Sequence, residues 1–175
     1  MAKPDERKTP VAVIVMGPAG VGKTTTAHLL AASLGWPFAE GDRFHPQANI
    51  DRMSRGIPLT DADRAPWLAG VRDWISLQAD SGHSVVVTCS ALKRTYRDVL
   101  RGARADVRFV QLLADPEVAA ARMTGRTGHF MPPSLLASQF AALESLQPDE
   151  AGVRIAAEKP PDIVAAQAML DLSHS

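Results

Sequence analysis

Apolar and polar positions change their spacing repeatedly along the chain, from continuous apolar runs to helical periodicity and back. Continuous runs are typical of strands buried on both faces. They occupy residues 11–16, 36–40, 85–88, 107–113 and 153–156. Helical spacing follows at residues 25–34, 61–81, 93–97, 115–123, 133–146 and 161–172. Alternating strands and helices predict a three-layer α/β/α fold, in which helices cover both faces of a parallel sheet.

Residues with special backbone preferences mark the ends of several predicted elements. Gly35 follows the first helix at a C-cap position, and Asp115 with Pro116 precedes a later helix as an N-cap and N1 pair. Residues 42–63 are rich in charges and turn residues, and we expect an irregular surface loop there. Without a repeat or linker, the sequence predicts one domain at residues 10–175 behind a flexible tail at residues 1–9.

Composition limits the expected location and partners. Acidic and basic residues balance at 19 each, so no net field favours nucleic acid or an anionic membrane. The single cysteine, Cys89, excludes an internal disulfide and fits a reducing compartment. The charged first residues lack the apolar core of a signal peptide, and no apolar run approaches the ~20 residues that cross a bilayer. We therefore expect a soluble, cytoplasmic protein without nucleic-acid or membrane partners.

The turn after the first strand carries a phosphate-binding loop pattern, in which a glycine and four further residues precede Gly-Lys-Thr. Glycines allow main-chain N–H groups to curl around an anion, and the following helix directs its positive end at the same point. Lys23 can reach the β and γ phosphates of ATP, and the Thr24 hydroxyl is suited to bind Mg²⁺. The expected nucleotide-binding residues are Gly17, Pro18, Ala19, Gly20, Val21, Gly22, Lys23, Thr24 and Thr25.

Charged residues also follow the second and third strands. Asp42 comes directly after the second strand, and Lys93 and Arg97 lie one helical turn apart after the third. Ligands of open α/β sheets bind beyond the carboxyl ends of the strands. These three side chains are therefore candidates for ligand contacts, and a solvated basic face is the alternative for the two cations.

Two arginines lie near the end of the fourth predicted helix. Arg122 and Arg126 precede a stretch rich in glycine and proline. This composition predicts a mobile lid at about residues 122–134, which would bring cations over the nucleotide. An ordinary exposed helix end is the alternative, because arginine also interacts favourably with the helix dipole there.

The loop by itself indicates nucleotide binding and leaves the reaction open. A GTPase would need a guanine-reading Asn-Lys-x-Asp motif, which is absent from the sequence. An ATPase motor would need an apolar strand that ends in aspartate, but the third predicted strand ends in Thr88. A small-molecule kinase needs the loop, a carboxylate near the acceptor hydroxyl and closing arginines. All three have candidates, so the sequence favours a kinase, with a noncatalytic nucleotide-binding module as the alternative.

Several segments resemble the gluconokinase family. The match runs in order from Val13 to about Glu150, and the segments 41–67 and 89–98 are far more particular to this family than the phosphate loop. Shikimate and adenylate kinases share the fold but match poorly in these two segments. The resemblance is carried by residues 17–24, 41–46, Asn49, Met53, Gly56, 58–64, Trp67, 89–98, Arg122, Arg126, 128–130 and 138–144.

The resemblance implies a P-loop NTPase fold of the nucleoside-monophosphate-kinase-like type with a mobile lid. It implies transfer of the γ-phosphoryl group of ATP to the 6-hydroxyl of D-gluconate with Mg²⁺, a step of sugar-acid catabolism that feeds the pentose phosphate or Entner-Doudoroff route. It also implies a homodimer. A kinase for another polyol or sugar acid, such as shikimate, is the nearest alternative. Pro18 and residues 131–133 depart from the family pattern.

Roles for individual residues follow from the chemistry of phosphoryl transfer. We expect Lys23, Arg122 and Arg126 to stabilise charge on the transferring group, and Asp42 to orient and deprotonate the acceptor hydroxyl. A loop cap or an outer-shell Mg²⁺ ligand is the alternative for Asp42. Gluconate needs cations for its carboxylate and hydrogen-bonding groups for its hydroxyls. The substrate-binding candidates are Asp42, His45, Arg64, Lys93, Arg97, His129 and Gln139.

Overall fold

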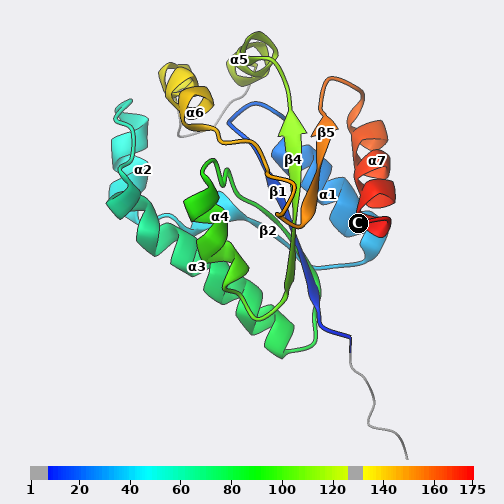
Figure 1. The fold of residues 1–175 in the computed structure, drawn as a ribbon. Coiled ribbons are helices and arrows are strands. Elements are labelled where there is room, and N and C mark those ends of the chain that lie inside the picture. Colours follow the sequence, from blue (N-terminus) through cyan, green and yellow to red (C-terminus); the bar gives the residue numbers. More distant parts are fainter. Residues whose placement is uncertain (1–7, 126–131) are drawn as a thin grey trace, which may run out of the picture.

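A five-stranded sheet forms the centre of the computed structural model, which describes residues 8–125 and 132–175. Its strands are β1 (Val11–Met16), β2 (Phe38–Glu40), β3 (Val85–Thr88), β4 (Asp106–Leu113) and β5 (Gly152–Ala156). Their spatial order is β2-β3-β1-β4-β5, and every neighbouring pair is parallel. The carboxyl ends of all five strands therefore lie at one edge of the sheet (Figure 1). This arrangement confirms the predicted α/β fold.

Helices cover both faces of the sheet and its carboxyl edge. Those on the faces are α1 (Lys23–Leu34), α3 (Asp61–Asp80), α4 (Arg94–Arg101) and α7 (Pro161–Ser173). Those nearer the carboxyl edge are α2 (Gln47–Ser54), α5 (Pro116–Thr124), α6 (Leu136–Ala142) and the short 3-10 helices η1 (Gly41–Phe44) and η2 (Pro133–Leu135). In Figure 1, α3 and α4 lie on one side of the sheet, and α1 and α7 on the other.

Alternate residues of the central strand divide the core between these two faces. Ala12, Ile14 and Met16 pack in one apolar cluster with side chains of α3 and α4. Val13 and Val15 point the other way and pack with side chains of α1, α5 and α7. A strand that is buried on both faces reads as a continuous apolar run, which is the pattern that the sequence shows. Across residues 8–125 and 132–175, no helix has both the length and the hydrophobicity for a membrane crossing.

Residues 42–63 differ from the expected irregular loop, because they contain η1 and α2. Helix α2 has only two buried side chains, Asn49 and Met53. The Asn49 amide donates a hydrogen bond to the Asp63 carbonyl, and Met53 packs against Leu59 and Leu135. These tertiary contacts stabilise a short polar helix that has few apolar side chains of its own. The predicted helix at 133–146 also ends earlier, at Ala142.

Arg97 is a structural residue and not the ligand contact that we expected. Its side chain is fully buried, and its guanidinium forms an ion pair with the equally buried Glu150 at 2.7 Å. The same group donates to the carbonyls of Ala91 and Glu144. These bonds join α4 to the segment after α6. A buried charge requires such partners, and the guanidinium of Arg97 is engaged by Glu150 and main-chain carbonyls.

Replacing Glu150 with glutamine should destabilise the fold by about 3 kcal/mol at pH 7, because Arg97 would lose its buried counter-charge. Burial opposes ionisation of Glu150, but hydrogen bonds from Arg97, the Gln147 amide and Arg101 outweigh it and lower its pKa from 4.5 to about 2. A lowered folded-state pKa stabilises above the unfolded value and loses that effect as the pH falls. Urea unfolding should therefore give a difference between wild type and Glu150→Gln that is full at pH 7 and shrinks between pH 4.5 and 2.

The neighbouring pair of Arg94 and Asp149 supplies the control. The Asp149 side chain is 65% exposed, so Asp149→Asn should change the unfolding midpoint far less. Equal effects of the two substitutions, or a Glu150→Gln effect that does not vary with pH, would contradict the assigned role of the buried pair.

Candidate active site

The loop between β1 and α1 has the backbone of an anion-binding site. Gly17, Gly20 and Gly22 have φ values of 142°, 80° and 95°, which favour glycine. At Gly20 a Cβ would also lie 2.4 Å from the Ala119 carbonyl oxygen. Helix α1 begins at Lys23 without a side-chain cap or an acidic residue in its first turn. Its first N–H groups and its positive dipole end are thus directed toward the loop.

Lys23 is held across this loop. Its Nζ donates hydrogen bonds to the carbonyl oxygens of Gly17 and Pro18 at 2.9 and 2.8 Å. The loop also contacts α6, because the Ala19 N–H donates to Oε1 of Gln139 at 2.7 Å. Gln139, a predicted substrate-binding residue, therefore lies against the phosphate-binding loop.

Two carboxylates follow one another at the end of β2. Glu40 is the last residue of the strand, and Asp42 lies in η1. The Thr24 hydroxyl donates to the Glu40 carboxylate at 2.6 Å, and the Thr88 hydroxyl donates to it at 2.8 Å. Glu40 is thus fixed between the phosphate-binding loop and the end of β3.

The sequence analysis missed Glu40. The rule that selected Asp42, a carboxylate at the carboxyl end of a strand, applies equally to Glu40 two residues earlier. Its hydrogen bond from Thr24, 16 residues away, depends on the order of the strands, which the sequence pattern leaves open.

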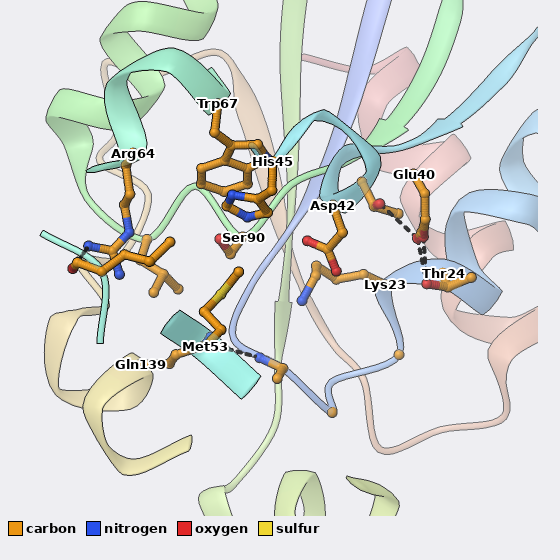
Figure 2. A pocket seen from close by; sticks show the side chains of 16 residues that line it. Lys23, Thr24, Glu40, Asp42, His45, Met53, Arg64, Trp67, Ser90 and Gln139 are labelled. Atoms are coloured by element: carbon orange, nitrogen blue, oxygen red, sulfur yellow. Dashed lines mark hydrogen bonds between the residues drawn. The ribbon is translucent and has the colours of Figure 1, made fainter. Parts of the chain in front are cut away.

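A cleft lies at this edge of the sheet, between the phosphate-binding loop and the start of α3. Figure 2 shows Lys23, Thr24, Glu40 and Asp42 along one side of the cleft, and His45, Trp67 and Arg64 along the other. Six of the predicted site residues outside the segment 17–22 therefore meet in one place. They are Lys23, Thr24, Asp42, His45, Arg64 and Gln139.

The wall opposite the phosphate-binding loop is built on Trp67. This residue is 1% exposed, and its indole N–H donates to the Gly41 carbonyl at 2.9 Å. The His45 ring stacks on the indole with 4.2 Å between ring centroids and 15° between the planes. Burial, and secondarily the positive charge of Arg64, lower the pKa of His45 to about 4. His45 is thus a neutral group at physiological pH.

Arg64 provides the positive charge on this wall. It donates to the Leu59 carbonyl at 2.6 Å and to the Tyr96 hydroxyl at 3.1 Å. Burial, together with a hydrogen bond to Asp61, raises the pKa of Tyr96 to about 12. The phenol therefore stays neutral and supports the guanidinium without adding charge.

Lys93 lies outside the lining of this cleft. Its Nζ is 3.5 Å from a carboxylate oxygen of Asp61 and 5.7 Å from the centre of the Tyr96 ring. Both substrate-binding candidates, Lys93 and Arg64, thus lie by the Tyr96 ring, but of the two it is Arg64 that lines the cleft.

Arg122 lies beside a second cleft, of about 390 Å³. Its guanidinium donates to the carbonyl oxygens of Val21 and Ala157 at 3.0 and 2.8 Å. This cleft is lined by Gly20, Val21, Gly22, Thr25, Thr26, Arg122, Ala157, Lys159, Pro161 and Val164. It adjoins the first cleft through the phosphate-binding loop. The other predicted lid residues, Arg126 and His129, lie outside the described residues.

Comparison with known proteins gives consistent matches over most of the chain. A family model described as an AAA domain matches residues 13–146. A gluconokinase from Gluconobacter oxydans (strain 621H) is 53% identical over 152 residues, which cover 87% of this chain and 85% of the relative.

Two solved structures are similar in both sequence and fold. An unliganded sugar kinase from Janibacter sp. HTCC2649 is 51% identical with a TM-score of 0.88, over 94% of this chain and 96% of that one. A gluconokinase from Sinorhizobium meliloti 1021 is 43% identical with a TM-score of 0.82, over 95% of this chain and 93% of that one.

Proposed function

The chain belongs to the gluconokinase family, and from the site that it builds we infer that it transfers the γ-phosphoryl group of ATP to the 6-hydroxyl of D-gluconate. The products are 6-phosphogluconate and ADP. The observation that carries this function is the first cleft, which brings together Lys23 of the phosphate-binding loop, Asp42 and Arg64. A homodimer and a cytoplasmic location belong to the same proposal. The homodimer rests on the family resemblance, and the location rests on the single cysteine, which fits a reducing compartment.

ATP would occupy the two clefts that meet at the phosphate-binding loop. The main-chain N–H groups of the loop and Lys23 would bind the β and γ phosphates. The second cleft, beside Arg122, has the size for the nucleoside. Arg122 already contacts the main chain on both sides of that cleft, so it is placed to hold the nucleotide against the loop.

Mg²⁺ fits the oxygen atoms at the loop end of the first cleft. The hydroxyl of Thr24 and the carboxylate of Glu40 lie together there, and oxygen ligands of this kind suit Mg²⁺. The residues that the structure describes include no cluster of three or more histidine, cysteine or acidic side chains with metal-ligand spacing. Phosphate oxygens and water would therefore supply the remaining ligands. When bound, the ion would neutralise charge on the phosphates.

Asp42 would accept the proton of the 6-hydroxyl. Phosphoryl transfer leaves little covalent chemistry to the protein, so the positioning of the hydroxyl contributes much of the rate. Asp42 lies next to Lys23 in Figure 2, between the phosphate-binding loop and the wall that carries His45 and Arg64. A hydroxyl bound to Asp42 would thus face the γ phosphate.

Arg64 would bind the carboxylate of gluconate. It lines the cleft on the wall opposite the phosphate-binding loop. An extended six-carbon acid whose 6-hydroxyl contacts Asp42 would carry its carboxylate toward that wall. A guanidinium held by Leu59 and Tyr96 is well suited to an anion, because little side-chain freedom is lost on binding.

Asp42→Asn should lower kcat with gluconate by about 10² to 10⁴-fold, since the amide cannot accept the proton. KM for ATP should stay within about twofold, because Asp42 contacts the acceptor and not the phosphates. Steady-state kinetics with a coupled ADP assay measure both values. Turnover near that of wild type would rule out the proposed role.

Glu40→Gln should raise the Mg²⁺ concentration for half-maximal activity by about tenfold or more, because it removes the carboxylate charge from the proposed metal site, and changes at such sites affect affinity on this scale. Mg²⁺ titrations at fixed ATP and gluconate measure the change. Asp73→Asn, an exposed acidic position on α3, is the matched control and should leave the titration unchanged. Identical titrations for Glu40→Gln and wild type would contradict the proposed metal site.

Arg64→Met should raise KM for gluconate by about 10 to 100-fold, the range that a charged hydrogen bond of about 1.5 to 3 kcal/mol gives. Lys93→Met removes the same charge outside the cleft and should raise KM by less than about threefold. KM for ATP serves as the internal reference in both variants. A larger effect at Lys93 than at Arg64 would indicate that Lys93, and not Arg64, binds the carboxylate of gluconate.

A further inference from the structure

The His45 ring lies in the first cleft between Asp42 and Arg64, stacked on Trp67 (Figure 2). An imidazole at this position has two possible uses toward a hydroxyl group. With Nε2 unprotonated, it would accept the proton and compete with Asp42 as a base. With Nε2 protonated, it would donate a hydrogen bond.

Asn49 decides between these two forms. The residue is 4% exposed, and its Nδ2 lies 2.8 Å from the main-chain carbonyl of Asp63. A carbonyl oxygen can only accept, so this contact fixes the orientation of the amide and places its NH₂ group there. The same Nδ2 lies 3.3 Å from Nδ1 of His45. Since an NH₂ group can only donate, Nδ1 of His45 is the acceptor, and the proton of the neutral ring is on Nε2.

We propose that Asn49 is a positioning residue that fixes His45 as an N–H donor to a secondary hydroxyl of the acceptor substrate, and that Asp42 is thereby the only one of the two that can take a proton. This inference rests on the proposed function for the identity of the substrate. The assignment of the ring nitrogens rests on the contacts of Asn49 alone.

The surroundings of His45 support a neutral donor. The stack on Trp67 holds the plane of the ring, and its burial opposes a positive charge. Arg64 on the same wall acts in the same direction. Protonation at Nδ1 would in addition turn the N–H group of the ring toward the NH₂ group of Asn49. A second cation beside Arg64 is therefore disfavoured, and selection of the substrate carboxylate stays with the arginine.

A donor at His45 and an acceptor at Asp42 complement one another. A hydroxyl group can accept one hydrogen bond from His45, whereas the hydroxyl that reacts donates its proton to Asp42. A site with fixed donors rejects analogues that lack the matching hydroxyl, because the buried N–H group then loses its partner. His45 would thus determine specificity for the polyol chain.

The first test needs no substrate. Nitrogen-15 NMR of histidine-labelled protein at pH 7 should show Nδ1 of His45 as the unprotonated nitrogen and Nε2 as the protonated one. His45→Gln assigns the signal among the five histidines of the chain. In Asn49→Ala the ring should shift toward a mixture of the two forms. An unprotonated Nε2 in wild type would overturn the proposal, whatever the substrate proves to be.

The second test uses gluconate and monodeoxy gluconates that retain the 6-hydroxyl. His45→Leu should raise KM for gluconate by about 5 to 10-fold, and Asn49→Ala by about threefold or more, as expected for the loss of a neutral hydrogen bond. KM for ATP should change by less than twofold in both. His45→Gln, whose amide can present an N–H group, should retain most of the affinity. Gln47→Ala, at an exposed position on α2, the helix that contains Asn49, should behave as wild type.

One deoxy analogue should be bound equally by wild type and His45→Leu, and it identifies the hydroxyl that His45 contacts. If no analogue removes the difference, or if His45→Gln loses as much affinity as His45→Leu, the donor role is wrong. The panel also separates this inference from the proposed function. Wild type that fails to phosphorylate gluconate would contradict the function, whereas the NMR result would still test the assignment at Asn49.

Discussion

The close approach of two main-chain segments at Gly41 and Thr88 determines how the site is built. A Cβ at Gly41 would lie 1.9 Å from the Thr88 carbonyl oxygen, so only glycine permits this contact. The Gly41 N–H donates to the Thr88 hydroxyl, and the Gly41 carbonyl accepts from the Trp67 indole. This small region thereby fixes Glu40 on one side and Asp42 on the other. Both carboxylates then face the phosphate-binding loop across the edge of a parallel sheet.

Positive groups lie at the two ends of the first cleft. Lys23 and the loop N–H groups form one positive end, and Arg64 forms the other. Asp42 lies between these ends, Glu40 lies beside Thr24 at the loop end, and the neutral ring of His45 separates Asp42 from Arg64 in Figure 2. Such an arrangement suits two anionic ligands that approach from opposite ends and meet at a proton acceptor. It also explains why a neutral histidine is preferable to a charged one at this position.

Local sequence was sufficient to predict the strands, the phosphate-binding loop and the helix caps at Gly35 and Asp115. Their signals lie within a few residues, as in the apolar run at 11–16 followed by Gly17 and Lys23. Helix α2 was missed because contacts of Asn49 and Met53 with distant residues stabilise it. The ligand-binding role predicted for Arg97 was wrong, because its partner, Glu150, is 53 residues away in the sequence. Helical spacing placed Lys93 and Arg97 on one face, but it could not show which face was buried.

The most direct measurement is a crystal structure of the protein with a nonhydrolysable ATP analogue, Mg²⁺ and gluconate bound together. We expect the triphosphate in the loop between β1 and α1, the 6-hydroxyl within hydrogen-bonding distance of Asp42 and pointing at the γ phosphorus, and the carboxylate on Arg64. A 6-hydroxyl turned away from Asp42, or a triphosphate bound outside that loop, would contradict the proposed mechanism.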